Sequence, residues 1–416
     1  MYCDLGTSSK FMCAAGTKVE LPCDKPLNIK NIRKALAFIF DSLNKKEERW
    51  REMCTSWDIE NVQITHLEHE NGLLPTAYRV LVRFHAVDKP YSVLVKVRNP
   101  EVFRAEGVEE NEVARNCNYL EKYVKLHERE VKFNNEIAPS ASISVPAVYY
   151  TQLWDLNSNQ EGIIVQEDLI REAVVQNVYN GLTTEQVGSV LSHLAEFHAS
   201  LLCDVNIDET LSRFAPLESA VSSVDRNKLV DDLRQLYTQY FNSEDHALRK
   251  FILNEANGSV ENKRKRVKRT VLAHGNLWTT NVKFKKSLLG RASTEVRGIL
   301  NWQYCHEGSP IEDIACLIVT STNSNVRKEH TNTFLHFYHE QLKENLRKRN
   351  KDMPYTLEEI HSMYNDEYPS QVFFLLHSHI PFILSPIFSG KATDSQKEML
   401  ANRMRDAFDE IRHNYL

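Results

Sequence analysis

The sequence predicts an α+β protein of two lobes, a small lobe built on an antiparallel sheet and a large, mostly helical one. In the first third of the chain, apolar residues alternate with polar ones over short segments, as in strands. From Thr183 onward most apolar residues recur at helical spacing. Between helices, two apolar strands at residues 271–273 and 296–300 each end in a polar cluster. They predict a hairpin, within residues 271–303, that carries an active-site edge.

The composition limits the class of protein. The chain has 416 residues, of which 42% are hydrophobic and 26% charged, enough for a sizeable core. A net charge of −5 does not indicate the basic face that nucleic acid requires, and we expect no nucleic-acid partner. Eight cysteines lie scattered without a CxxC pair, which favours free thiols in a reducing compartment over a zinc site.

We expect a cytoplasmic protein without a membrane span. The N-terminus has no basic region followed by an apolar run, so no signal peptide is visible. The longest apolar stretch, residues 372–388, is interrupted by His377, His379, Pro381 and Pro386. It therefore predicts a buried helix rather than a span, and the two histidines are expected to line the core or a groove, without a metal.

The elements of the small lobe follow in order. Residues 1–28 are weakly patterned and predict a loose leader, and residues 29–166 form the N-lobe. An amphipathic helix is expected first, from the spacing of Ile29, Ile32, Leu36, Ile39 and Leu43. A Glu- and Lys-rich helix ending near residue 131 separates three strands from two more. These five strands are expected at residues 62–67, 77–84, 91–97, 145–150 and 162–166.

The large lobe is expected over residues 167–416, after a hinge near residues 166–170. Thr183 and Thr184, followed by Glu185, predict the capped start of a long helix. His198 lies on the apolar face of that helix and is expected to be a core histidine. Beyond the predicted hairpin, residues 310–415 are almost entirely amphipathic helix.

Several motifs occur in the order of a known family. The chain resembles the CHK kinase-like proteins, the ecdysteroid kinase-like and nematode DUF1679 group of the aminoglycoside phosphotransferase and choline kinase superfamily. The motifs that carry the resemblance are Val95-Lys96, His127-Glu-Arg-Glu130, Val165-Gln-Glu-Asp-Leu169, Gly181 to Val187, His274-Gly-Asn-Leu-Trp-Thr-Thr-Asn281, Ile299-Leu-Asn-Trp-Gln303 and Pro310-Ile-Glu-Asp313.

This resemblance implies a bilobed protein kinase-like fold that uses ATP and Mg²⁺. Lys96 would contact the nucleotide phosphates and Glu130 would pair with it. Glu167 lies in the hinge motif expected to meet adenine, and Gly72 stands alone where the family has a glycine-rich loop. His274 would hold a turn by hydrogen bonding. The catalytic position is Asn276, and the metal positions are Asn281 and Asn301.

The family pattern has aspartate at positions 276 and 301, and this chain has asparagine at both. An aspartate at 276 would take the proton of the substrate hydroxyl, which an amide does not do near neutral pH. An aspartate at 301 would bind Mg²⁺, which prefers carboxylate oxygens. The chain keeps the shape of the site while losing both charges.

Three functions remain open. The first is a pseudokinase that binds a nucleotide, a small hydroxylated ligand or a protein partner without turnover. The second is an ATP-dependent phosphotransferase that acts on a small-molecule hydroxyl with impaired or atypical activity, in which Glu307, Glu312 or Asp313 lends a carboxylate. The third is a scaffold that binds neither nucleotide nor metal.

One basic run stands apart from these motifs. It extends from Lys263 to Arg269 and contains six lysines and arginines among seven residues. A solvated loop explains it, and a nuclear-import signal is the alternative.

Overall fold

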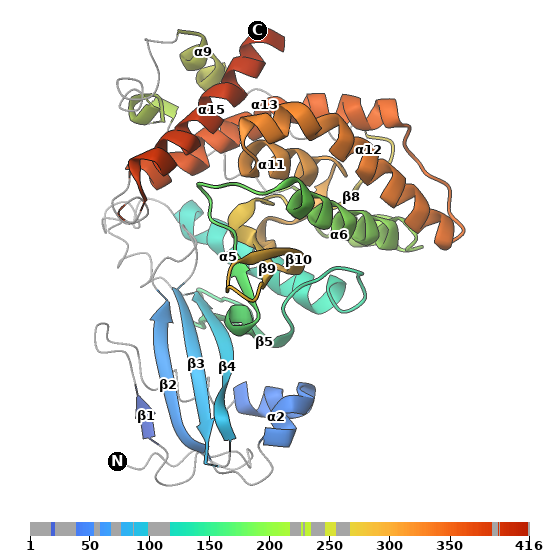
Figure 1. Cartoon of the computed structure of the whole chain (residues 1–416). Coiled ribbons are helices and arrows are strands. Elements are labelled where there is room, and N and C mark those ends of the chain that lie inside the picture. The colour runs from blue at the N-terminus through green and yellow to red at the C-terminus, as the bar shows by residue number, and fades with distance from the viewer. Residues whose placement is uncertain are drawn as a thin grey trace. The chain divides into compact units, whose positions relative to one another are not determined.

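The computed structural model describes residues 18–20, 39–53, 59–67, 76–85, 87–98, 117–216, 226–227, 229–233, 246–254, 267–384, 390 and 392–414. The chain divides into two compact units (Figure 1). The first consists of Met1–Asn135 and Pro146–Arg171. The second consists of Glu136–Val145 and Glu172–Leu416.

The first unit is built on one six-stranded sheet with the strand order β1-β2-β3-β4-β6-β5. Its β1 is parallel to β2, and every other pair is antiparallel, which confirms the predicted sheet. β1 lies within the segment expected to be a loose leader. The strands are β1 (Lys18–Glu20), β2 (Ile59–Leu67), β3 (Thr76–Phe84), β4 (Val87–Arg98), β5 (Val148–Gln152) and β6 (Gly162–Glu167).

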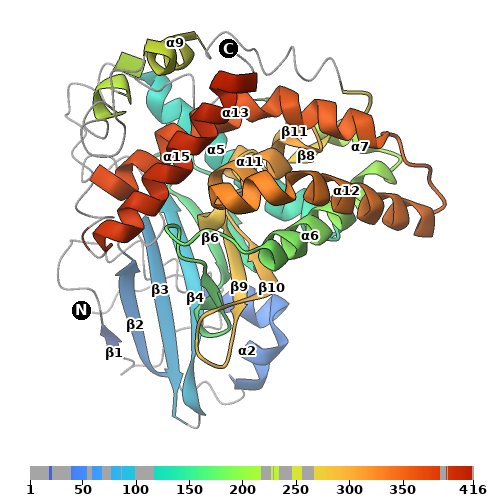
Figure 2. The same cartoon turned by 45° about the horizontal axis from the view of Figure 1, so that its top comes forward.

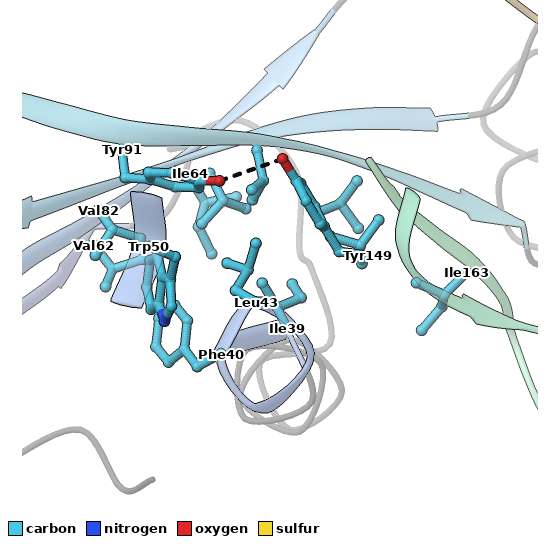
Figure 3. Packing of buried hydrophobic residues seen from close by; sticks show 14 of the residues in the cluster. Ile39, Phe40, Leu43, Trp50, Val62, Ile64, Val82, Tyr91, Tyr149 and Ile163 are labelled. Carbon is cyan, nitrogen blue, oxygen red and sulfur yellow. Dashed lines mark hydrogen bonds between the residues drawn. The ribbon is translucent and has the colours of Figure 1, made fainter. Parts of the chain in front are cut away.

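One face of this sheet is covered by helical residues 39–46 and by α2 (Glu48–Met53). Ile39 and Leu43 of the predicted amphipathic helix are buried there, and residues 28–38 lie outside the described part. Trp50 stacks on Phe40 with ring centroids 5.2 Å apart. Figure 3 shows this apolar cluster beneath the strands, closed on one side by a hydrogen bond of 3.3 Å between the Tyr91 and Tyr149 hydroxyls.

The side chains of β4 and β6 that point away from this core meet α5 (Cys117–Lys132). Because neighbouring side chains on a strand point to opposite faces, Lys96 and Arg98 point to the face of the sheet away from Val93 and Val95. A β-carbon at Gly162 would come within 2.7 Å of the His127 ring, so glycine allows close packing of the helix on β6. The chain then passes through a π-helical turn (Phe133–Ile137).

The second unit is mainly helical, as predicted. Thr183 is the N-cap of α6, and its hydroxyl and the Gln186 side chain form a capping box. α6 packs against α12, α11 against α13, and α13 against α15, as Figure 2 shows. The helices are α6 (Thr184–Leu202), α7 (Ile207–Ser212), α9 (His246–Asn254), α11 (Glu312–Ser321), α12 (Ser324–Lys348), α13 (Leu357–Leu384) and α15 (Asp394–Asn414).

The apolar stretch expected to form a buried helix lies largely in α13, where Val372, Leu375 and Leu376 are fully buried. In the part of the chain that the structure describes, no helix is both long and apolar enough to cross a membrane.

The predicted hairpin of residues 271–303 is wrong in its strand pairing. β8 (Val271–Ala273) pairs with β11 (His306–Gly308), and not with the strand that ends before Asn301. That strand, β10 (Ala292–Ile299), forms a true hairpin with β9 (Val282–Lys286), and β7 (Ala173–Val175) completes its sheet. The two polar clusters therefore follow strands of separate sheets, although both belong to the second unit.

Candidate functional site

In the first unit, a buried ion pair joins β4 to α5. Lys96 Nζ lies 2.6 Å from Glu130 Oε1, and the two residues are 6% and 2% exposed. Arg98, two residues along the same face of β4, lies 4.0 Å from the other oxygen of Glu130. The structure thus brings Lys96 and Glu130 together as the resemblance implies. Arg98 was missed, although its spacing of two from Lys96 signals the shared face.

The charges around Glu130 favour its ionised form. Burial alone would raise the pKa of Glu130, but Lys96 and then Arg98 lower it below its usual value. The neighbouring His127 is held neutral because burial lowers its pKa, and its Nε2 lies 2.7 Å from the Gln152 carbonyl oxygen. The lysine is therefore fixed by a carboxylate that remains charged across the neutral pH range.

At the end of β6, Glu167 and Asp168 fasten the chain to neighbouring segments. The backbone N–H of Glu167 donates to Ala147, and its carboxylate accepts from the Ala147 N–H. Asp168 accepts from Arg79 and from Ser92, each at 2.6 Å. Asp168 is thus a structural clamp on β3 and β4. The adenine contact implied for Glu167 stays a prediction.

In the second unit, the loop after β8 is held by Asp313 at the start of α11. One carboxylate oxygen accepts the His274 N–H at 2.6 Å, and the other accepts the Gly275 N–H at 3.0 Å. Gly275 has φ +74°, and a β-carbon there would lie 2.5 Å from the Tyr304 carbonyl oxygen, so the turn requires glycine.

His274 links the two motif loops. Its Nε2 lies 2.8 Å from the Leu300 carbonyl, which only accepts, so the ring carries its hydrogen on Nε2. Its Nδ1 then accepts the backbone N–H of Asn276 at 3.2 Å. Its ring also packs edge-on against Trp302. His274 therefore orders the loop, and both of its ring nitrogens are occupied.

The three asparagines form a chain of amide hydrogen bonds. Asn281 Nδ2 donates to the backbone carbonyl oxygen of Asn276 at 2.7 Å, which directs Asn281 Oδ1 toward Asn301. Asn301 Nδ2 donates to that oxygen at 2.8 Å. The orientation is fixed because the carbonyl of Asn276 accepts but does not donate. Asn301 has φ 67° and ψ 56°, a left-handed conformation that asparagine tolerates well.

This geometry does not fit Mg²⁺. The ion prefers oxygen ligands, usually including carboxylates, in a near-ideal octahedron. Here Asn281 Oδ1 accepts the amide of Asn301, and the amide group that Asn301 turns toward Asn281 is a donor. Neither side chain is charged. Among the described residues, no group of three or more His, Cys, Asp and Glu side chains could hold a metal ion either.

Besides the Thr279 hydroxyl, two buried polar groups near these loops accept or donate no hydrogen bond within the described chain. One is the Oδ1 atom of Asn276, the atom that replaces the carboxylate oxygen of the family pattern. The other is the side-chain amide of Gln303, which is 1% exposed. Buried polar atoms usually have a partner, so Asn276 Oδ1 is suited to accept a hydrogen bond from a bound molecule.

A second charged cluster lies at the start of α11, and its histidine, His306, was missed from the sequence. His306 Nε2 is 3.1 Å from Glu312 Oε2, and its Nδ1 is 2.9 Å from the Tyr304 carbonyl. Burial alone would lower the pKa of His306, but Glu312 raises it to about 9. Burial, and then the charge of Glu312, raises the pKa of Asp313 to about 7.

The other predicted histidines and tryptophans are packing residues. His198 is buried, and its Nδ1 lies 2.7 Å from the Tyr338 hydroxyl. His379 is buried with its Nε2 2.9 Å from the Thr320 carbonyl. Trp278 packs on His379, and Trp302 packs on Phe197 as well as on His274. These contacts confirm the expected core roles of His198 and His379.

Some predicted features lie outside the described residues. Gly72 is one, and residues 263–266 of the basic run are another. The described end of that run is anchored: Lys268 pairs with Glu359, and the Arg269 carbonyl accepts from the Tyr355 hydroxyl. The cytoplasmic location and the import signal stay predictions.

The elements of the two units together define a class of fold. The first unit has the lysine strand, the glutamate helix and the hinge strand, and the second has two polar loops backed by helices. This is the composition of a phosphotransferase-like kinase fold.

The family follows from a direct match. The family model DUF1679, described as "Uncharacterized oxidoreductase dhs-27", matches residues 91–416, and the chain belongs to this family. This confirms the resemblance drawn from the motifs.

The chain is also similar to a curated protein and to several solved structures. The uncharacterized oxidoreductase dhs-27 of Caenorhabditis elegans is 25% identical over 384 residues, which cover 86% of this chain and 43% of that protein. The chain therefore spans less than half of this relative's length. Among solved structures, the GDP complex of wild-type aminoglycoside 2'-phosphotransferase-IIIa has a TM-score of 0.41 at 13% identity, covering 88% and 99% of the two chains. Choline kinase LicA from Streptococcus pneumoniae has a TM-score of 0.38 at 14% identity, covering 89% and 99%.

Proposed function

We propose that this chain is a pseudokinase, a kinase-fold protein that binds a nucleotide without transferring its phosphate. The observation that carries the proposal is the hydrogen bond from Asn301 Nδ2 to Asn281 Oδ1 at 2.8 Å. The two side chains at the metal positions of the family pattern are hydrogen-bonded to each other. A magnesium ion would have to break this bond and would gain no carboxylate in return.

The first unit supports nucleotide binding. Lys96 is held in place by a buried and charged glutamate, so its ammonium group needs no reordering to meet a phosphate. A second cation, Arg98, lies beside the same glutamate. Lys96 and Arg98 thus place two cationic side chains on the same face of β4, and cationic side chains suit an anionic ligand.

The second unit supports binding without turnover. The Asn276 side chain can accept a hydrogen bond from a ligand hydroxyl, but it cannot remove the proton. General-base catalysis is typically worth about 10²–10⁴-fold, and this contribution is lost. The bound hydroxylated molecule is part of the same proposal.

The alternative is an impaired phosphotransferase, which the intact Lys96–Glu130 pair favours. It would need a substitute carboxylate, and the three candidates are engaged elsewhere. Glu307 accepts from the Thr270 hydroxyl, Glu312 pairs with His306, and Asp313 accepts two backbone N–H groups. Each would have to give up these contacts, and this weighs against the alternative.

The sheet of the first unit does not suit a dinucleotide-binding oxidoreductase. Dinucleotide-binding oxidoreductases of the doubly wound class use a mostly parallel sheet with a glycine-rich first turn. The described six-stranded sheet is antiparallel except for the β1–β2 pair.

A thermal-shift titration with ATP, with Mg²⁺ or with a chelator, tests the proposal. ATP at about a hundred times its dissociation constant should stabilise the unsubstituted chain by roughly 2.7 kcal/mol, and equally in both conditions. Asn301→Asp should make the stabilisation larger when Mg²⁺ is present, because it supplies the missing carboxylate.

Asn350→Asp is the matched control. Asn350 has a similar left-handed conformation, with φ 56°, but is exposed, so its change should leave the magnesium response unaltered. A shift of the unsubstituted chain that requires Mg²⁺, or phosphate transfer in a radiolabel assay, would overturn the proposal. No shift with ATP would favour a scaffold.

A further inference from the structure

The β9–β10 hairpin ends in two adjacent, exposed leucines. Leu288 is 107% exposed and Leu289 is 82% exposed. Among the described residues, Leu288 is the most exposed large hydrophobic side chain. Single exposed apolar residues are ordinary, but two neighbours at the tip of a hairpin form a contiguous apolar surface.

The turn that carries the leucines is ordered. The Ser287 N–H donates to the Arg291 carbonyl, and the Gly290 N–H donates to the Ser287 carbonyl, both at 2.8 Å. Gly290 has φ +74°, and the Ser287 hydroxyl also accepts the Arg291 N–H at 3.2 Å. A turn closed by a left-handed glycine is a common hairpin connection. The leucines are thus held at the tip by the backbone of the turn.

The hairpin is basic in a chain that is acidic overall. Residues 282–299 contain five lysines and arginines and one glutamate, whereas the whole chain has a net charge of −5. Lys286 and Arg291 are exposed at the base of the turn, beside the leucines. Lys285 pairs with Glu295 and Arg297 with Glu172, so part of the local charge is compensated.

We propose that this tip docks on an anionic membrane surface, with the two leucines at the level of the lipid headgroups. Lysine is depleted in protein–protein interfaces, and leucine is under-represented among their hot spots. Apolar side chains such as leucine, combined with lysine and arginine, are instead typical of segments that lie at membrane interfaces. The leucines add apolar burial, and the basic side chains add attraction to acidic lipids.

Co-sedimentation of the full chain with vesicles tests this proposal. Vesicles of phosphatidylcholine alone are compared with vesicles containing about a third phosphatidylserine. We expect binding to the acidic vesicles that weakens as salt increases. Leu288→Ser/Leu289→Ser should reduce the partition coefficient about a hundredfold, and Lys286→Gln/Arg291→Gln about twentyfold.

Val205→Ser is the control, because Val205 is a single hydrophobic side chain, 90% exposed, that follows Asp204. It should bind as the unsubstituted chain does, and all variants should keep their melting temperature because the changed residues are exposed. Failure of the unsubstituted chain to bind acidic vesicles at millimolar lipid would overturn the proposal. So would unchanged binding by the leucine variant, or equal binding to both vesicle types. A dimer in sedimentation velocity that the leucine variant abolishes, without vesicle binding, would overturn it in favour of a contact between two copies.

Discussion

At the scale of single residues, the free energy of unfolding of the first unit depends strongly on three buried charged side chains. Glu130 faces both Lys96 and Arg98, and all three side chains are almost fully buried. Taking ions out of water costs several kcal/mol each, and their mutual attraction offsets that cost. The cluster is therefore sensitive to the loss of any one member.

Glu130→Gln should destabilise the chain more than Lys96→Met. The first change removes the carboxylate that both buried cations face, whereas the second leaves Glu130 with Arg98 at 4.0 Å. We expect losses of about 5 and about 3 kcal/mol in the free energy of unfolding, measured by urea denaturation.

Lys45→Met is the control for this series. Lys45 pairs with Asp41 in an exposed i,i+4 arrangement, and its loss should cost less than about 0.5 kcal/mol. Equal effects of the Glu130 and Lys96 changes would contradict the role given to Arg98.

The residues of the candidate site could be found from the sequence only where a motif named them. Lys96 and Glu130 were predicted as partners and are paired. The hydrogen bond between the side-chain amides of Asn281 and Asn301 was not predicted, because the sequence pattern showed the loss of charge but not how the side chains are oriented. His306 lies in no motif, and its pairing with Glu312 depends on the turn that brings β11 to α11.

At the scale of elements, the start of α11 is tied to β11 by the ion pair of His306 and Glu312. The folded-state pKa of His306, about 9, lies above the ordinary value of 6.5 expected in the unfolded chain. The folded chain therefore binds this proton more tightly. The resulting stability is fully present below about pH 6.5 and is lost as the pH rises through about 9.

The free energy of unfolding should accordingly fall by roughly 2–3 kcal/mol between pH 6.5 and pH 9. His306→Gln, which does not titrate, should remove most of that slope. Urea unfolding at several pH values measures it, with His330→Gln as a control at a partly exposed histidine. An unchanged slope in His306→Gln would refute this assignment.

The elements themselves were largely predictable, because apolar spacing reports whether a segment is strand or helix. The pairing of strands was not. Both Val271–Ala273 and the strand before Asn301 are apolar and end in polar residues, and this suggested a single hairpin. β8 instead pairs with β11, a segment of three residues that contains His306 and Glu307 and shows no strand pattern.

At the scale of the whole molecule, acid stability is governed in part by histidines that are buried uncharged. Burial lowers the pKa of His198 and of His379 to about 3, from an ordinary value of 6.5. The unfolded chain therefore takes up two protons near pH 5 that the folded chain does not. Asp313 opposes this with one proton, because its pKa is raised to about 7.

From pH 7 to pH 5 we expect a net loss of about 1 kcal/mol in the free energy of unfolding, because the raised pKa values of Asp313 and His306 offset most of the loss from the two histidines. In the double variant His198→Gln/His379→Gln the slope should vanish or reverse, since the raised pKa values of Asp313 and His306 then act against the remaining buried histidines, His127 and His377. Urea unfolding at pH 7, 6 and 5 provides the comparison. A variant that keeps the original slope would show that other groups control it.

The hydrogen bond between the side-chain amides of Asn301 and Asn281 also bears on which solution conditions affect the two motif loops. An amide pair has no charge to screen and no proton to lose near neutral pH. On the proposed function, chelators and changes in magnesium concentration should therefore leave these loops unchanged. Changes of pH near neutrality should still reach the first loop, because Asp313, which accepts its His274 and Gly275 N–H groups, has a pKa of about 7.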